Sequence, residues 1–251
     1  MAVLWKDPAI AFLDDFDAPA LDRGAWLPHY LPHWSSRAAS VATHAVEDSE
    51  LRLTIPTGQG VWCEGDHEPP LRVSGVQSGV HSGPDGSTVG QQPFRDGQAV
   101  REAGPTWWGV TPQLGRLEVR ARMELSPRSM ASVWMVGLED QPDRCGEICI
   151  FEVFGDAPTA IGMGIHPFRD AALTDDFAAP ELDIDIREPH VYAADWREDR
   201  VEFSVDGEPV RTVAQAPDYP MQFMVAVFDF PSKPGPSDRV PLLAVDSVRV
   251  G

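Results

Sequence analysis

Turn-forming residues interrupt this chain of 251 residues throughout, since it contains 24 Pro and 21 Gly. Between them lie short runs in which apolar and polar residues alternate, for example residues 51–55 and 117–123. Alternation with a period of two is typical of strands that are buried on one face, and frequent Pro excludes long helices. Asp206–Gly207 between two such runs indicates a hairpin turn. The pattern predicts an all-β protein, a two-sheet antiparallel β-sandwich. The length fits a single domain over residues 1–251 as well as it fits two small domains.

One run of β-forming residues carries two acids. Residues 146–155 read GEICIFEVFG, so Glu147 and Glu152 lie within an otherwise apolar strand. Buried carboxylates are costly unless they are paired or used in chemistry. Strand alternation places Glu147 and Cys149 on one face and Glu152 on the other. A β-bulge near Ile150 or Phe151 would return Glu152 to the face of Glu147. Two carboxyls on one concave face are what glycoside hydrolysis requires, one as nucleophile and one as proton donor.

The same run resembles the signature of glycoside hydrolase family 16, the laminarinase- and lichenase-like β-glucanases. Its usual form is Glu-Ile-Asp-Ile-x-Glu, followed by a hydrophobic pair and Gly. The resemblance implies that Glu147 is the nucleophile and Glu152 the acid/base, while Cys149 occupies the position of the family's helper Asp. It also implies a concanavalin A-like jelly roll with a concave substrate cleft. Weaker matches follow in the family's order, from residue 12 to residue 250.

Several aromatic and polar residues are candidates for sugar binding, because aromatic faces pack against pyranose rings. The resemblance implies that Trp134 is a sugar platform and that His166 reaches the cleft. Each candidate also has a purely structural interpretation, since aromatic residues and a lone His on an apolar strand commonly belong to the core. The predicted substrate-binding set consists of Tyr30, Trp34, Trp107, Trp134, His166, Gln222 and Phe228.

No cofactor is expected. The three Cys show neither a disulfide framework nor zinc-ligand spacing. The resemblance implies a possible structural calcium site on the convex face, at the matching positions Asp15 and Asp246. Calcium takes six to eight oxygen ligands, and the alternative is that these acids are simply solvated.

The charge balance restricts the partners. The chain has 20 Lys and Arg against 39 Asp and Glu, a formal net charge of −19, which disfavours nucleic acid and anionic membranes. A polysaccharide or oligosaccharide is the expected partner, and a monomer the expected state. The N-terminus lacks a signal-peptide pattern and no apolar run has membrane-spanning length. The sequence therefore predicts a cytoplasmic protein, or a secreted one if a leader has been removed.

Together these features predict a retaining endo-β-glycosidase of the β-glucanase type that hydrolyses a polysaccharide by double displacement. A thiol at Cys149 in place of an Asp removes a negative charge, which predicts easier ionisation of both glutamates and an acid-shifted optimum. Two alternatives remain open. The sandwich could be a lectin-like module that binds saccharides without cleaving them. The second alternative is a thiol enzyme in which Cys149 acts together with His166.

Overall fold

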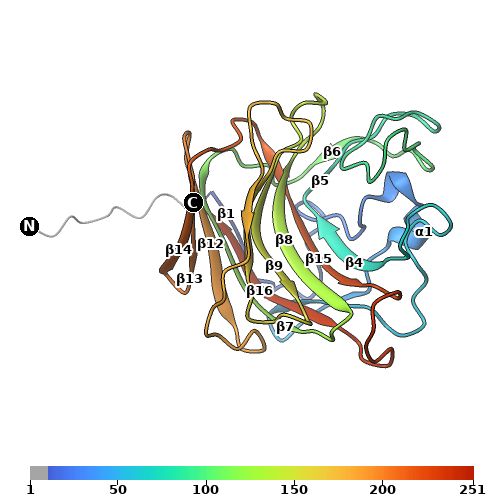
Figure 1. The fold of residues 1–251 in the computed structure, drawn as a ribbon. Coiled ribbons are helices and arrows are strands. Elements are labelled where there is room, and N and C mark those ends of the chain that lie inside the picture. The colour runs from blue at the N-terminus through green and yellow to red at the C-terminus, as the bar shows by residue number, and fades with distance from the viewer. Residues whose placement is uncertain (1–10) are drawn as a thin grey trace, which may run out of the picture.

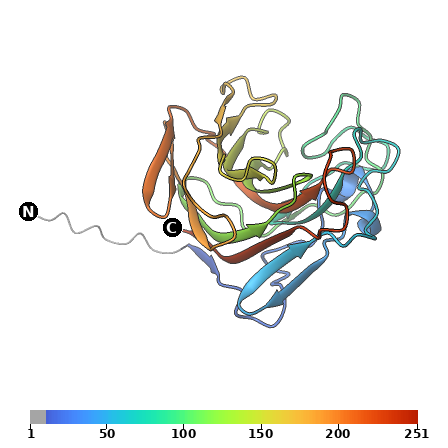
Figure 2. The same ribbon diagram turned by 60° about the horizontal axis from the view of Figure 1, so that its bottom comes forward.

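The computed structural model describes residues 11–251, which form two stacked antiparallel sheets (Figures 1 and 2). The larger sheet has the order β14-β13-β12-β7-β16-β3-β2, with β1 paired to β16. Its strands are β1 (Phe12–Asp14), β2 (His44–Glu47), β3 (Glu50–Thr54), β7 (Gly115–Glu124), β12 (His190–Trp196), β13 (Val201–Val205), β14 (Glu208–Val213) and β16 (Leu242–Val250).

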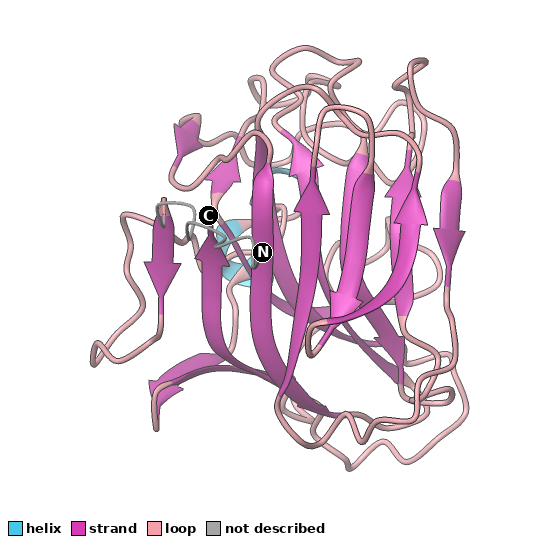
Figure 3. Ribbon diagram, turned by 90° about the vertical axis from the view of Figure 1, so that its left-hand side faces the viewer, coloured by secondary structure: helices cyan, strands magenta, loops and turns pink. Residues whose placement is uncertain are grey.

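The smaller sheet carries the acidic strand and has the order β11-β10-β9-β8-β15-β4. Its strands are β4 (Arg72–Gln77), β8 (Ser129–Gly137), β9 (Glu147–Phe154), β10 (Gly162–His166), β11 (Asp176–Ala178) and β15 (Met221–Asp229). Outside the two sheets lie a ribbon of β5 (Gly79–Val80) and β6 (Trp107–Trp108), a 3-10 turn η1 (Pro32–Trp34) and the short helix α1 (Arg37–Ser40). The turned view in Figure 3 shows how fully strands dominate the molecule.

The main core lies between the sheets and follows the alternation in the sequence. On β7, every second residue from Leu117 to Met123 is buried in this core, while the residues between them are partly exposed. Across the sandwich, Val133 and Met135 of β8 supply the opposing layer. The predicted two-sheet antiparallel sandwich is confirmed. The predicted hairpin at Asp206–Gly207 joins β13 to β14, and both residues have positive φ, as a type I′ turn requires.

A second apolar cluster covers part of the outer, concave face of the smaller sheet. Residues of β8 and β15 that point away from the main core meet residues from the long connections before β2, β4 and β6. In Figure 2 these connections gather at the β4 side of the molecule. The connections leave the β8–β10 side of the concave face open, and a pocket lies there. The buried members of this second cluster are Leu31, Trp34, Trp62, Cys63, Leu71, Val73, Val100, Met130, Trp134, Val136, Met224, Ala226 and Phe228.

Within residues 11–251, no helix has the length and apolar character needed to cross a membrane. The predicted absence of a signal peptide rests on the N-terminal residues, which lie outside the described part of the chain.

Candidate active site

The acidic strand β9 contains the β-bulge that the sequence predicts. Along β8, Val133 faces Phe151 but the next residue, Trp134, faces Cys149, so Ile150 has no partner on that neighbour. The register to β10 shifts at the same place. Ile150 and Phe151 are consecutive, and both are buried in the main core. The extra residue reverses the alternation. The side chains of Glu147, Cys149 and Glu152 therefore all project from the concave face of the smaller sheet.

These three side chains line one pocket of about 260 Å³. Glu147 is 9% exposed and Glu152 is partly exposed, so both carboxyls adjoin a cavity rather than the packed core. Four of the predicted substrate-binding residues line the same pocket, namely Tyr30, Trp134, His166 and Phe228. The remaining lining residues are His67, Leu71, Gln92, Met130, Ser132 and Phe230.

Burial controls the protonation of the two glutamates. It raises the pKa of Glu147 from 4.5 to about 8, with further contributions from the nearby carboxyls of Glu152 and Glu139, while a hydrogen bond from Gln92 acts in the opposite direction. Burial also raises the pKa of Glu152, and His166 partly offsets this rise. Cys149 adds no ionised carboxylate to this pair, but desolvation still raises the pKa of both glutamates above the ordinary value. Two interacting carboxyls of this kind titrate as a pair.

His166 is held at the pocket by its own partners. It is the cross-strand neighbour of Glu147, and its Nδ1 lies 2.7 Å from Oδ1 of Asp175. Its ring stacks on Phe177, with 4.7 Å between the ring centroids. A carboxylate partner on one ring nitrogen fixes the orientation of an imidazole. His166 is therefore an oriented pocket residue rather than a member of either buried core.

The environment of Cys149 argues against thiol chemistry. Cys149 is 3% exposed, and burial together with Glu152 and Glu147 raises the pKa of its thiol well above the usual range. Its Sγ lies 3.9 Å from the carbonyl oxygen of Gly162, and Nδ1 of His166 is occupied by Asp175. A nucleophilic cysteine requires a thiolate, which this site disfavours.

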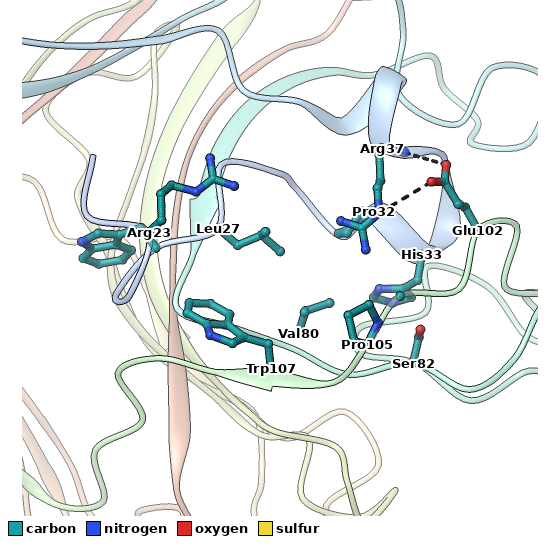
Figure 4. A pocket seen from close by; sticks show the side chains of 12 residues that line it. Arg23, Leu27, Pro32, His33, Arg37, Val80, Ser82, Glu102, Pro105 and Trp107 are labelled. Atoms are coloured by element: carbon teal, nitrogen blue, oxygen red, sulfur yellow. Dashed lines mark hydrogen bonds and ion pairs between the residues drawn. The ribbon is translucent and has the colours of Figure 1, made fainter. Parts of the chain in front are cut away.

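Three predicted substrate-binding residues lie outside the carboxyl pocket. Trp34 is fully buried and its Nε1 donates to the carbonyl of Gln91 at 2.6 Å, so it belongs to the second cluster. Gln222 projects from the concave face, but Gly79 and the β5–β6 ribbon cover it. Trp107 lines a different pocket of about 290 Å³, shown in Figure 4, which has no lining residue in common with the carboxyl pocket. Strand parity alone could not show which parts of the face are covered.

The nominated calcium ligands make other interactions. Oδ1 of Asp246 forms an ion pair with Nη1 of Arg120 at 2.6 Å, and Oδ1 of Asp15 accepts a hydrogen bond from the backbone of Asp17. Within the described chain, no three or more His, Cys, Asp or Glu side chains gather as metal ligands. A calcium site at Asp15 and Asp246 therefore stays a prediction.

Sequence reasoning missed the residues that loops bring to the site. Nε2 of Gln92 donates a hydrogen bond to Oε1 of Glu147, and Glu139, just beyond the end of β8, is a buried acid whose pKa burial raises to about 7. His67 and Gln92 come from loops far from β9 in the sequence. Neither loop carries a recognisable motif, so no signal in the sequence identifies them.

The fold and site together define a class of protein. A β-sandwich whose concave face presents two carboxyls between aromatic walls is typical of carbohydrate-active proteins of the jelly-roll type. The comparisons with known proteins give the family. The model described as "Glycosyl hydrolases family 16" matches residues 111–234, which include Glu147 and Glu152. This match to glycoside hydrolase family 16 covers just under half of the chain, and it supports a glycosidase.

Individual relatives agree with this assignment. Glucan endo-1,3-beta-glucosidase A1 of Niallia circulans is 24% identical over 218 residues, which cover 80% of this chain and 30% of the relative. The structure of a GlcNAcα1-4Gal releasing endo-β-galactosidase from Clostridium perfringens matches with a TM-score of 0.81 and 25% identity, over 96% of this chain and 62% of that one. A laminarinase from Flavobacterium sp. UMI-01 shares the fold, with a TM-score of 0.68, 18% identity, and 96% and 99% of the two chains covered. This chain thus spans less than a third of the curated relative's length.

Proposed function

We propose that the protein is a retaining endo-β-glycosidase that hydrolyses a β-linked glucan or a related polysaccharide. The observation that carries the proposal is the bulged strand β9, which brings Glu147 and Glu152 to one pocket. The match to glycoside hydrolase family 16 supports the reaction class. The signature order supports Glu147 as nucleophile and Glu152 as acid/base, and retaining glycosidases use two carboxyls in these roles.

The proposed reaction has two displacement steps. Ionised Glu147 attacks the anomeric carbon while the bond to the leaving sugar oxygen breaks, and Glu152 gives its proton to that oxygen. The product of this step is a glycosyl ester on Glu147. Glu152, now ionised, then takes a proton from water as the water oxygen attacks the anomeric carbon and releases Glu147. Both carboxyls regain their starting protonation states.

The pair must hold one proton for this reaction to begin. Mutual repulsion in a buried site favours that state, because ionising the second carboxyl beside the first is costly. His166, across from Glu147 on β10, lies where its charge would stabilise ionised Glu152. We propose that His166 supports Glu152 during the second step, when that carboxyl acts as the base.

A substrate panel tests the proposal directly. Laminarin, lichenan and galactose-containing glycans should be incubated with the protein, with release of reducing ends as the signal. The galactosides are included because of the Clostridium perfringens structure. Proton NMR of the fresh product should show the β-anomer first if configuration is retained. Saccharide binding without cleavage, unchanged in Glu147→Gln, would instead support the lectin-like alternative.

The pH range of activity is expected to lie above that of an enzyme whose catalytic carboxyls have ordinary pKa values. Activity needs the singly ionised pair, and burial raises the pKa of both glutamates, that of Glu147 to about 8. The descending limb of kcat/KM is therefore expected near pH 8 and the ascending limb above pH 4.5. Initial rates between pH 3 and pH 10 would measure both limbs. An optimum below pH 4.5 would contradict the conclusion that burial raises both pKa values.

Replacing Trp134 by Ala is expected to lower kcat/KM by about tenfold or more, mainly through KM, because the pocket loses an aromatic wall. Trp134 lines the carboxyl pocket and lies beside Phe228, with 6.2 Å between the ring centroids. Trp34→Phe is the matched control, since Trp34 is buried in the same cluster but does not line the pocket. The control should lower the melting temperature and leave KM unchanged. Equal KM values for Trp134→Ala and wild type would mean that Trp134 does not contribute to substrate binding.

A further inference from the structure

A row of side chains leads from the exposed residue Arg169, which lines a neighbouring pocket together with Glu139, to Glu147. Nη2 of Arg169 forms an ion pair with Oε2 of Glu139, and Oε1 of Glu139 accepts a hydrogen bond from the backbone N–H of Gln92 at 2.6 Å. The side-chain amide of Gln92 then donates through Nε2 to Oε1 of Glu147. Three segments far apart in the sequence are joined in this row, which ends on the proposed nucleophile.

The fold holds each member of the row in place. Glu139, just beyond the end of β8, is 4% exposed. The backbone N–H of Arg169 donates to Sγ of Cys145 at 3.2 Å, beside the start of β9. The loop that carries Gln92 is fixed through its neighbour Gln91, whose Nε2 donates to the carbonyl of Leu138 at 3.0 Å.

Gln92 is the member of this row that contacts the proposed nucleophile. The amide hydrogens face Glu147, and an N–H donor stabilises a carboxylate rather than a neutral carboxylic acid. We propose that Gln92 is a positioning residue for Glu147, fixing the orientation of the carboxyl and favouring its ionised form, and that the Arg169–Glu139 ion pair holds Gln92 in place. The inference rests on the proposed function only where it names Glu147 as the nucleophile.

No other side chain of the described residues donates a hydrogen bond to the carboxyl of Glu147, so the loss of Gln92 has no evident replacement. Aromatic, hydroxyl and thioether side chains of β8 and β15 complete the pocket without adding a charge. The titratable and charged groups around Glu147 are Glu152 and Cys149 on its own strand, His166 with Asp175 from the β10 side, Glu139 with Arg169, Tyr30 from the N-terminal segment, and His67 from the loop before β4.

The experiment is a titration of the Glu147 carboxyl by carbon-13 NMR on the full chain, with Glu147→Gln used to assign the signal. Gln92→Leu should raise the pKa of Glu147 by about one unit, because the carboxylate loses its donor. Glu139→Gln should lower it, because a like charge is removed while an oxygen acceptor for the Gln92 N–H remains. Opposite signs from two neighbouring substitutions are not expected from a general loosening of the site.

Gln98→Leu is the matched control for Gln92→Leu. Gln98 is a buried glutamine of the same loop, but its amide donates to Asp66 rather than to Glu147. Gln98→Leu should leave the pKa of Glu147 within about 0.3 units of the wild-type value. If Gln92→Leu does not fold, Gln92→Glu keeps the size of the side chain and should raise the pKa further through like-charge repulsion.

Two results would overturn the inference: an unchanged Glu147 pKa in Gln92→Leu, or an equal shift in Gln98→Leu. The titration does not require turnover. A protein that shows the shift but cleaves no glycan would refute the proposed function and leave the role of Gln92 intact. In an active enzyme, the limb of the kcat/KM profile near pH 8 should move upward with the same substitution, because it reports the carboxyl pair to which Glu147 belongs.

Discussion

Replacing Glu147 by Ala is expected to lower the rate of glycoside cleavage by about 10⁴-fold or more, because no glycosyl ester can then form. The substitution leaves a cavity beside the anomeric carbon. Sodium azide should restore part of the activity by attacking the sugar from the side that Glu147 occupied, giving a glycosyl azide of inverted configuration. The measurement is kcat with and without azide, together with NMR of the azide product.

Glu152→Ala is the companion variant, and it separates the two roles. With an activated leaving group, this variant should still form the glycosyl ester, and azide should attack that ester to give a product of retained configuration. Glu118→Ala, a partly buried acid on the opposite sheet, is the matched control and should stay close to the wild-type rate. If Glu147→Ala gave the azide of retained configuration and Glu152→Ala the azide of inverted configuration, the assignment of nucleophile and acid/base would be reversed.

Replacing Glu147 by Gln is expected to stabilise the folded protein at neutral pH. The pKa of Glu147 is raised in the folded state from 4.5 to about 8, so this carboxyl costs no stability below pH 4.5 and progressively more as the pH rises towards 8. The cost is about 1.4 kcal/mol per pH unit, on the order of 3 kcal/mol at pH 7. Glutamine keeps the shape without the charge. The measurement is the free energy of unfolding in urea at several pH values.

Two comparisons test the cause of that gain. At pH 4 the variant and the wild type should have equal stability, since both then carry a neutral side chain. Glu50→Gln should have the opposite sign at neutral pH, because Arg122 lowers the pKa of Glu50 in the folded state. A gain in Glu147→Gln that is the same at pH 4 and pH 8 would mean that the stabilisation comes from packing and not from ionisation.

Local patterns were sufficient to predict the sandwich and the acidic strand. Alternation on β7 and the hairpin at Asp206–Gly207 depend on neighbours in the sequence, and the bulge at Ile150 follows from requiring Glu147 and Glu152 to share a face. Each of these features is decided within about ten residues. Strand period and turn chemistry act over that range, which is why one sequence can reveal them.

The walls of the site depend on contacts between distant segments. Trp34 was a reasonable sugar platform by composition, but the loop between β5 and β6 brings the carbonyl of Gln91 onto its indole N–H and buries it. Gln92 reaches Glu147 across 55 positions of sequence. The size of the desolvation at the two glutamates could not be predicted either, because the sequence shows which charges are present but not how much water the fold removes from them.

The second cluster has a consequence for how the protein could change. Loops before β4 and β6 fill one part of the concave face, so they bound the space in which a saccharide can lie, whereas the sheet only supplies its floor. Loops tolerate insertions and deletions far better than the strands they connect. Shortening them would extend the binding track towards β4 without altering the acidic strand. In the proposed enzyme, glycan preference and the residues that break the bond are in this way encoded in separate parts of the chain.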